Sequence, residues 1–271
     1  MQLGFSACDL ELLAFPHPEL VLTARRQTAE KTWYHCPLVS FIIDHPDGLI
    51  LWETGAAPTA AEEWPKDWQE VVDLGGVTPE NSLERKLASL GLGPEDFRYV
   101  ILGHLHSDHA GGLRLFEDAG ATIIVHEDEY RHVTQIADAA DFFVRKDWHF
   151  LGAKAPTTVY GDQEILRGVS TVSLPGHTPG TMGLKLELPH TGTLLLTSDA
   201  LSTHWNYGSP AVGSPINWDD DRWRRSIEKI RRIASAENAL LVPGHDLQGF
   251  RHEGAAFGLE SIRYSPDYVY E

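Results

Sequence analysis

The sequence has few basic residues for its length. Its 271 residues include 22 lysines and arginines against 39 aspartates and glutamates, which gives a formal net charge of -17. Proteins that bind nucleic acids usually need a basic patch to meet the phosphate backbone. The acidic balance therefore disfavours a nuclease and anionic substrates, and we expect no nucleic-acid partner.

Long apolar runs and cysteines are also scarce. No apolar run approaches the ~20 residues that span a bilayer, and the N-terminal stretch lacks the basic start and apolar core of a signal peptide. The two cysteines, Cys8 and Cys36, form no CxxC pair. Such sparse cysteine usage is typical of thiols in a reducing compartment. We therefore expect a cytoplasmic protein with no membrane partner.

Short apolar runs bounded by turns predict strands in two groups along the chain. Residues 38–44 and 48–55 flank the turn sequence HPDG, which predicts a β-hairpin. Residues 98–104 and 121–127 are continuous apolar runs of the kind found in buried strands. Further apolar runs lie in the sequences VSTVSLPGH, TMGLKLELP, GTLLLTSD and ALLVPGH.

Helices are predicted between and after these strands. Asn81-Ser82-Leu83-Glu84 resembles a capping box, and three aspartates at 219–221 precede apolar residues at helical spacing. The basic residues of the second helix, at 224–232, are expected on its solvated face. Two groups of strands, each followed by helices, predict an α/β protein with two packed sheets and helices outside. Because no linker separates the halves, we expect residues 1–271 to form a single domain.

The densest group of chemically capable residues follows the strand predicted at 98–104. The sequence LGHLHSDHAGG places His104, His106, Asp108 and His109 within six positions. Alternate residues leaving a strand can point the same way, so His104 and His106 can face a common point. Neutral imidazoles and carboxylates are ligands for zinc and related divalent metals. A purely structural role is disfavoured by the density of the cluster.

Three further candidate ligands lie where an apolar run gives way to a polar turn: His177, Asp199 and His245. A lone histidine of this kind is more often structural, but three such residues together with the first cluster favour a metal site. Seven ligands are too many for one tetrahedral zinc and suit two metals that share a carboxylate. Asp199 is the candidate for sharing, since one carboxylate offers two oxygens.

Taken together, these motifs resemble the metallo-β-lactamase superfamily. The sequences HLHSDHAGG, PGHTPG and PGHD, with the strand-end Asp199, carry the resemblance over nearly the whole chain. The resemblance implies an αββα sandwich, in which two mixed β-sheets are flanked by helices and two metals lie at one edge of the sheets. Zinc is the expected metal, and iron, manganese and cobalt accept similar ligands. The ligands implied are His104, His106 and His177 for the first metal, Asp108, His109 and His245 for the second, and Asp199 as the bridge.

Within the superfamily the chain is most similar to the quorum-quenching N-acyl homoserine lactonases. The histidine motif, the segment at residues 79–101 and the chain length all look alike. This similarity implies a homodimeric hydrolase in which water activated between two metals attacks a lactone carbonyl. Asp108 would relay a proton to the leaving oxygen as the catalytic residue. A thioesterase or other ester hydrolase with the same metals is the alternative, and a non-catalytic metal-binding member of the fold is a third hypothesis.

Two positions depart from the lactonase pattern. Ser202 stands where those enzymes carry a tyrosine that helps bind the substrate carbonyl, and Glu53 stands where an aspartate supports the metal loops. His204 and Tyr207 are candidates to replace the tyrosine. The predicted substrate contacts are therefore Ser202, His204 and Tyr207.

Other aromatic and histidine residues carry weaker predictions. One group of aromatic side chains either lines an apolar pocket or belongs to the core or to dimer contacts, namely Trp64, Trp68, Phe142, Phe143, Trp148 and Trp205. The segment at residues 62–72 could cap the site or contact a second subunit. The histidines outside the motifs are expected to be structural or exposed, namely His126, His132, His149, His190 and His252.

Overall fold

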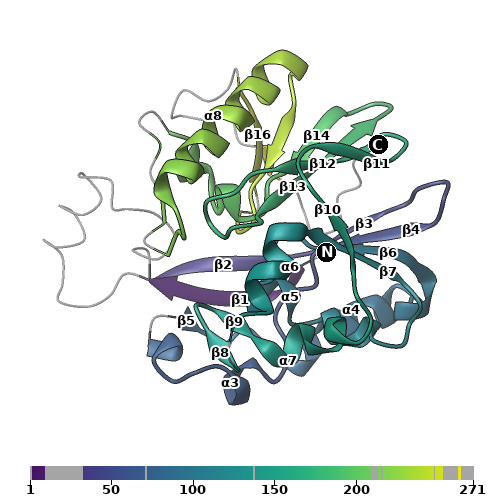
Figure 1. Cartoon of the computed structure of the whole chain (residues 1–271), viewed down its shortest axis with the longest axis vertical. Helices are drawn as coiled ribbons and strands as arrows, with labels where there is room; N and C mark the ends of the chain where they lie inside the picture. Colours follow the sequence, from purple (N-terminus) through teal and green to yellow (C-terminus); the bar gives the residue numbers. More distant parts are fainter. Residues whose placement is uncertain are drawn as a thin grey trace, which may run out of the picture.

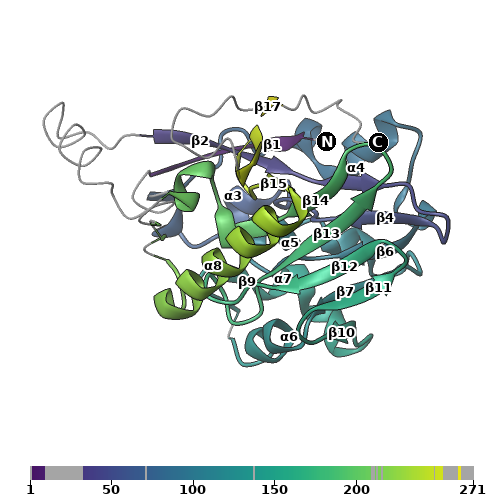
Figure 2. The same ribbon diagram turned by 90° about the horizontal axis from the view of Figure 1, so that it is seen from above.

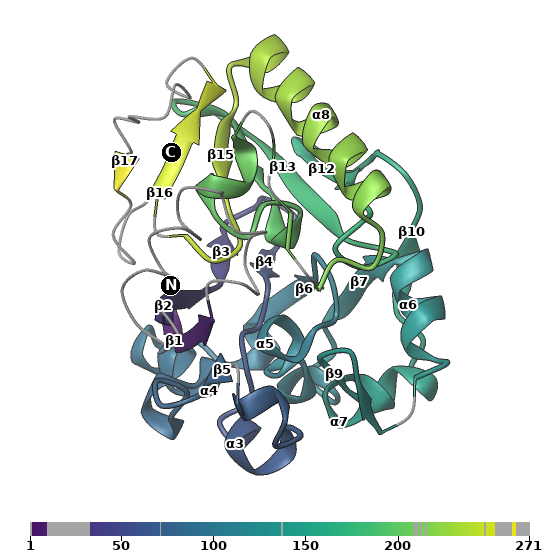
Figure 3. The ribbon, with the colours of Figure 1, turned by 90° about the vertical axis from the view of Figure 1, so that its left-hand side faces the viewer.

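The protein consists of four layers in the order helix, sheet, sheet, helix. In the computed structural model, Figure 1 shows α8 (Asp220–Glu237) on one outer face, α4 (Leu83–Ser89) and α7 (Arg145–Trp148) on the other, and the strands between them. Figure 3 shows the same separation of α8 from α7 in a second view. The structure describes residues 2–9, 33–70, 72–136, 138–208, 211, 213–214, 216–246, 248–252 and 262–263.

The first large sheet has the strand order β10-β7-β6-β4-β3. Four of its strands are parallel, and β3 is antiparallel to β4. Since parallel neighbours run in one direction, their carboxyl ends meet at one edge of the sheet. The strand bounds are β3 Phe41–Ile43, β4 Leu49–Trp52, β6 Phe97–Ile101, β7 Thr122–His126 and β10 Thr157–Val159.

The second large sheet has the order β11-β12-β13-β14-β15-β16-β17, and all neighbours are antiparallel except β14 and β15. Seen from above in Figure 2, α8 lies across β12 to β15. The strand bounds are β11 Gln163–Leu166, β12 Val169–Ser173, β13 Met182–Leu188, β14 Gly192–Leu196, β15 Leu240–Val242, β16 Gln248–Arg251 and β17 Ile262–Arg263.

Smaller elements complete the described part of the chain. A three-stranded sheet has the order β2-β1-β5, and β8 pairs with β9 in a short hairpin. The strands are β1 Gln2–Asp9, β2 Trp33–Val39, β5 Val72–Asp73, β8 Ala139–Ala140 and β9 Phe143–Val144. The remaining α-helices are α3 Ala60–Glu63, α5 Ser107–Ala110 and α6 Glu127–Val133. The 3-10 helices are η1 Trp68–Glu70, η2 Pro79–Asn81, η3 Pro94–Asp96, η4 Leu113–Phe116, η5 His149–Gly152, η6 Ser198–Leu201 and η7 His204–Tyr207.

The central core lies between the two large sheets. Side chains alternate along β4, so Ile50 and Trp52 enter this core whereas Leu51 packs toward the helices on the outer face. From the second sheet, Leu184 and Leu196 enter the same core. Burial of both faces of the first sheet explains why its strands are continuous apolar runs rather than alternating ones.

Helix α8 covers the outer face of the second sheet. Asp219 caps its start by accepting a hydrogen bond from Arg222 N at 2.9 Å, and its buried stripe includes Trp223 and Ile227. The prediction that its basic residues are all solvated was wrong for two of them. Lys229 donates to Ser173 O at 2.7 Å, and Arg231 donates to Tyr207 O, in η7, at 2.8 Å. Their long aliphatic stems lie along the helix flank, which lets the charged ends reach backbone carbonyls.

The sequence predicted most of these elements but not all of their boundaries. The αββα sandwich is confirmed, and so is the hairpin, whose turn is closed by a 2.8 Å bond from Gly48 N to His45 O. The predicted first hairpin strand was too long, because Val39 pairs with β1 instead. The capping box was wrong, because Ser82 alone caps α4 and the residue that bonds to it is Arg85. In the described part of the chain, none of the helices is long and apolar enough to cross a membrane.

Candidate metal centre

The seven predicted ligands lie at one edge of the two large sheets. Each follows the carboxyl end of a strand, in the loops after β6, β12, β14 and β15. Six of them are buried, and Asp108 has a side chain that is 22% exposed. Strands β6 and β14 belong to different sheets, so the packing of the sheets brings residues distant in sequence to one place.

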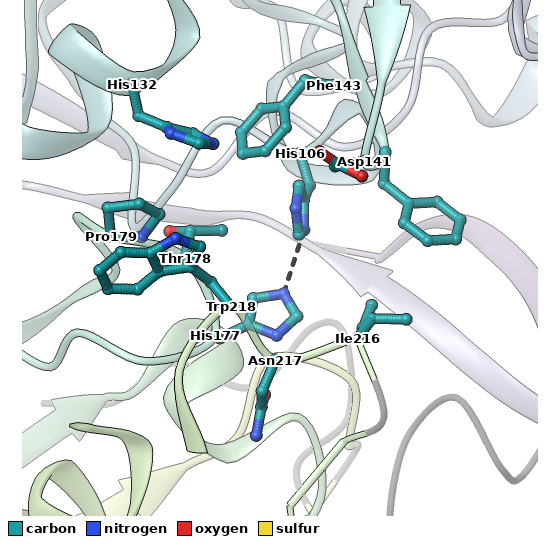
Figure 4. Close-up of a pocket in the computed structure, with 11 residues that line it drawn as sticks. His106, His132, Asp141, Phe143, His177, Thr178, Pro179, Ile216, Asn217 and Trp218 are labelled. Atoms are coloured by element: carbon teal, nitrogen blue, oxygen red, sulfur yellow. Dashed lines mark hydrogen bonds between the residues drawn. The ribbon is translucent and has the colours of Figure 1, made fainter. Parts of the chain in front are cut away.

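The first ligand group consists of His104, His106 and His177. The Nε2 atom of His104 lies 3.1 Å from Nδ1 of His106, and Nε2 of His177 lies 3.0 Å from the same atom. Figure 4 shows the rings of His106 and His177 pointing toward one another. Three ring nitrogens from two sheets therefore converge on one point.

The second ligand group consists of Asp108, His109 and His245. The Nε2 atom of His245 lies 3.3 Å from Oδ2 of Asp108 and 3.2 Å from Nε2 of His109. The other ring nitrogen of His245 lies 3.2 Å from Pro37 O, which holds the Nε2 atom toward the group.

Asp199 lies between the two groups. Its Oδ2 atom is 3.5 Å from Nε2 of His177 in the first group and 3.2 Å from Nε2 of His245 in the second. Its Oδ1 atom is 3.5 Å from Nε2 of His109 and is buried without a hydrogen-bond partner within the described residues. Its contacts match the geometry that a shared carboxylate requires.

The donor set fits divalent metal ions. Zinc–nitrogen bonds of about 2.0–2.1 Å in a tetrahedron place neighbouring ligand nitrogens about 3.3 Å apart. The ring nitrogens of both groups lie 3.0–3.2 Å from one another, close to that spacing. Three converging imidazole nitrogens cannot all be satisfied by protons, because each proton joins only two of them. A cation at each group satisfies the nitrogens and the unpartnered oxygen of Asp199 together.

The electrostatics of the two groups differ. Burial lowers the pKa of His104 and His106, and neighbouring histidines lower it further. Burial opposes protonation of His109 and His245 too, but Asp108 and Asp199 beside them raise their pKa values, that of His109 to about 9. The surroundings of the first group therefore favour neutral imidazoles, whereas the carboxylates of the second group attract positive charge.

Glu53, directly after β4, contacts both ligand groups, one through Ser198 and the other directly. Its Oε1 atom accepts hydrogen bonds from Ser198 Oγ at 2.9 Å and from Gly103 N at 3.2 Å. Ser198 Oγ also lies 3.1 Å from Nδ1 of His104, and Oε2 of Glu53 lies 3.5 Å from Nδ1 of His109. Glu53 and Ser198 both have left-handed backbones, with φ of 59° and 46°. Such strain is common where a backbone serves a functional site.

The short helix α5 is held tightly against the loop after β4. Thr54 donates to His109 O through its backbone N at 2.8 Å and its hydroxyl at 2.6 Å. A Cβ atom on Gly111 would lie 2.1 Å from Ala57 N, so only glycine permits this approach. The first glycine after the histidine motif thus serves the docking of the ligand loop.

A cavity of about 310 Å³ opens beside His106 and His177. Figure 4 shows the aromatic ring of Trp218 and the imidazole of His132 among its lining residues. Sequence reasoning missed both, because His132 lies on α6 and Trp218 in a loop, and neither belongs to a motif. The further lining residues are Asp141, Phe142, Phe143, Thr178, Pro179, Ile216 and Asn217.

The hairpin at residues 139–144 forms one side of this cavity, which we call the pocket wall. Its turn residues Asp141 and Phe142 have φ of 49° and 65°, as the tight turn of a two-residue hairpin requires. Ser107, within the histidine motif, donates its N to Phe142 O at 2.9 Å and accepts from Val144 N through its hydroxyl at 2.8 Å. The wall is therefore tied to the ligand loop.

The other predicted aromatic residues divide between core and cavity. Trp64, Trp68 and Trp148 belong to the apolar core outside the first sheet, and the ring centroids of Trp68 and Phe142 are 4.9 Å apart. Trp68, from the segment at residues 62–72, therefore packs against the pocket wall. The side chain of Trp205 lies outside the described part of the chain.

None of the three predicted substrate contacts lines the cavity. Ser202 is buried, and its carbonyl accepts a 2.7 Å bond from His245 N. Tyr207 lies in the core beneath α8, with its hydroxyl 2.6 Å from His252 Nδ1. The Nδ1 atom of His204 makes a close hydrogen-bond contact with Oδ2 of Asp246. Their roles toward substrate stay predictions.

Comparisons with known proteins agree with this fold. Residues 34–245 match the family model of the metallo-beta-lactamase superfamily, so the chain belongs to that superfamily. The chain is 34% identical over 227 residues to the N-acyl homoserine lactonase AttM of Azorhizobium caulinodans, covering 79% of this chain and 83% of that protein. It is 28% identical to the N-acyl homoserine lactonase AiiB of Agrobacterium fabrum, covering 84% of this chain and 86% of the other.

Solved structures are similar as well. An N-acyl homoserine lactone hydrolase with N-hexanoyl-L-homoserine at its catalytic metal centre superposes with a TM-score of 0.76 at 24% identity, covering 91% of this chain and 92% of the other. AidC, a dizinc quorum-quenching lactonase, gives a TM-score of 0.70 at 18% identity and covers 97% of this chain and 92% of the other. These likenesses establish the fold.

Proposed function

We propose that this protein is a lactonase that opens N-acyl homoserine lactones with two divalent metal ions, of which zinc is the expected metal. The proposal rests on Asp199, whose oxygens face both ligand groups. It is supported by the relatives AttM and AiiB, which are N-acyl homoserine lactonases. A neutral lactone also suits a protein with a net charge of -17.

In this proposal each ligand group would hold one metal, and Asp199, whose oxygens face both groups, would serve as the shared ligand. Bound there, the metals supply Lewis acidity, which polarises a carbonyl and lowers the pKa of water. Three neutral imidazoles and a carboxylate form a ligand set that zinc prefers. Glu53 and Ser198 orient His104 and His109 through contacts to their Nδ1 atoms.

Asp108 moves the proton. It is the most exposed of the seven predicted ligands, and its Oδ2 atom lies 3.3 Å from Nε2 of His245. Burial would raise its pKa, but His109 and His245 hold the pKa below its usual range, so the side chain is an ionised carboxylate at neutral pH. Water adds its oxygen to the lactone carbonyl carbon, and the ring C–O bond breaks. Asp108 takes the water proton and returns it to the leaving ring oxygen.

The cavity beside the first ligand group receives the acyl part of the substrate. Phe142, Phe143 and Trp218 give it an apolar lining, while His132 and Asp141 add polar groups. Apolar pockets with a few polar groups are typical of small-molecule sites.

An activity assay on metal-loaded protein tests the proposal. We expect the purified protein to open N-acyl homoserine lactones of short, medium and long acyl chains, measured as acid release with a pH indicator. A chelator should abolish the activity and zinc should restore it. Faster cleavage of thioesters than of lactones would replace the lactonase proposal with the thioesterase alternative. Metal content of about two ions per chain is the second expected result.

A homodimer and a cytoplasmic location are further parts of the proposal. Both come from the similarity to lactonases and from the composition of the sequence. Light scattering of the purified protein and fractionation of cells that express it are the corresponding measurements.

A further inference from the structure

The first ligand group is assembled from two separate loops. His104 and His106 follow β6 of the first sheet, and His177 follows β12 of the second. One backbone bond, from Met182 N to Gly103 O at 2.8 Å, joins the two loops near their bases. Because the ring nitrogens must converge within about 3 Å, something must also fix the loops at the level of the histidines themselves.

Glu129 of α6 lies between these loops. Its side chain is fully buried, with 0% exposure. Its Oε1 atom accepts a hydrogen bond from Leu105 N at 2.9 Å, between the two histidines of the first loop. Its Oε2 atom accepts from Thr178 Oγ1 at 2.6 Å and from Gly180 N at 3.0 Å, directly after His177 in the second loop. One carboxylate thus holds three donors from both ligand loops.

The surroundings of Glu129 require an acceptor with two oxygens. Two of the three partners are backbone N–H groups, one on each oxygen, so a carboxyl group satisfies both and an amide group does not. The hydroxyl of Thr178 is held in place by Thr181 Oγ1 at 2.8 Å. A Cβ atom on Gly180 would lie 2.3 Å from Glu129 N, so only glycine lets this loop approach the helix. The second glycine of the PGHTPG motif therefore permits the contact with Glu129.

Glu129 does not take part in any of the ligand clusters of the described residues. Both of its oxygens are already occupied by loop donors. It is also absent from the lining of the cavity. Its contacts therefore serve the loops rather than substrate or metal.

We propose that Glu129 is a positioning residue that sets the separation of the two loops of the first ligand group and so selectively strengthens metal binding at that group. The proposal rests on the two-metal function proposed above. The second ligand group does not contact Glu129. His245 follows β15, and Asp108 and His109 lie in α5, which Thr54 holds through His109 O, so the metal affinity of this group should not depend on Glu129.

Metal release from the whole protein tests the proposal. Zinc-loaded protein is mixed with excess coloured chelator, and the two release phases are followed. In Glu129→Gln, the amide NH₂ faces a donor, and we expect one of the two ions to leave about tenfold to a hundredfold faster while the other leaves at the wild-type rate. The visible spectrum of cobalt-loaded protein should change for one ion only. Glu127→Gln is the matched control, because Glu127 is on the same helix, exposed, and paired with Arg131; it should release both ions at the wild-type rates.

A second pair of variants tests the same contact independently, in case Glu129→Gln does not fold correctly. Thr178→Val removes one donor and should accelerate the same phase by a smaller factor, whereas Thr178→Ser keeps the hydroxyl and should restore the wild-type rate. Equal acceleration of both ions in Glu129→Gln and Thr178→Val would show a general structural role and overturn the proposal. Unchanged release in both would overturn it too. Wild-type protein that holds fewer than two ions would instead contradict the proposed function on which it rests.

Discussion

The two sides of the cavity are built in different ways. The metal edge, formed by the seven predicted ligands, stands on the ends of buried strands and is supported by buried carboxylates such as Glu53. The pocket wall is a two-residue turn between very short strands. The predicted ligands thus directly follow strands of the two large sheets, whereas part of the lining proposed to contact the variable part of a substrate lies on a small hairpin. Changes at the edge should affect turnover and metal binding, and changes at the wall should affect substrate affinity.

The largest effect is expected for Asp199→Ala. Because this side chain faces both ligand groups, its loss should lower kcat by at least about a thousandfold and reduce metal content. Elemental analysis and steady-state kinetics measure both. Asp118→Asn, at an exposed side chain, is the control. Full metal content in Asp199→Ala would show that the two groups need no shared ligand.

Asp108→Asn should have the second largest effect. The amide cannot carry a proton, so kcat should fall by about a hundredfold to ten-thousandfold while KM and the unfolding midpoint stay close to wild type. Kinetics, metal analysis and thermal unfolding test this expectation together. A variant with two bound metals and near-normal kcat would refute the proton-transfer role.

Phe142→Ala probes the pocket wall. Removing the ring from the cavity should raise KM for a long-chain lactone roughly tenfold and leave kcat within a few-fold of wild type. Leu90→Ala, an exposed apolar residue remote from the cavity, should change neither value. A loss confined to kcat would mean that the wall belongs to the catalytic machinery.

Ser107→Ala tests the connection between the two regions. It leaves Val144 N without its buried acceptor, which should cost about 1–3 kcal/mol of stability and raise KM a few-fold. Metal content should stay unchanged, because the hydroxyl contacts the wall and not a predicted ligand. Loss of metal in this variant would show that edge and wall are one unit.

The smallest effect concerns Glu63, which anchors the segment behind the wall. Burial raises its pKa, but hydrogen bonds from Arg114 and Lys146 outweigh that and lower it from 4.5 to about 2. A lowered folded-state pKa stabilises the fold above pH 4.5, and this stabilisation is lost as the pH falls toward 2. Glu63→Gln should therefore lower the free energy of unfolding by about 1 kcal/mol at neutral pH.

Urea unfolding of the wild type and of Glu63→Gln, at neutral pH and at a pH between the two pKa values, measures this effect. The gap between the two proteins should shrink in acid. A gap that stays constant with pH would mean that packing, rather than charge, explains the contribution of Glu63.

The metal edge could be predicted from the sequence because its signals are local. Four of the seven residues lie within six positions, and the others end apolar runs, so each is marked by a strand-to-turn transition. The structure brings all seven together. The strand groups likewise predicted two sheets, since buried strands leave continuous apolar runs.

The lining of the cavity could not be predicted in the same way. Asp141, Trp218 and His132 are ordinary residues in a short hairpin, a loop and a helix, and only tertiary packing makes them neighbours. Glu129 was missed for the same reason, because its three partners lie 24, 49 and 51 positions away. The errors at Lys229 and Arg231 arose because helical spacing predicts exposure but not what a long side chain can reach.

Ser198 sets protein stability against function at a single position. Its left-handed backbone, with φ of 46°, would be relaxed by glycine, which should remove roughly 1 kcal/mol of backbone strain. The same substitution would remove the hydroxyl that joins Glu53 to His104. Attempts to make this protein more heat-resistant by removing unfavourable backbone conformations would therefore select against the activity at this residue, and a thermostable variant should keep Ser198 and gain its stability elsewhere.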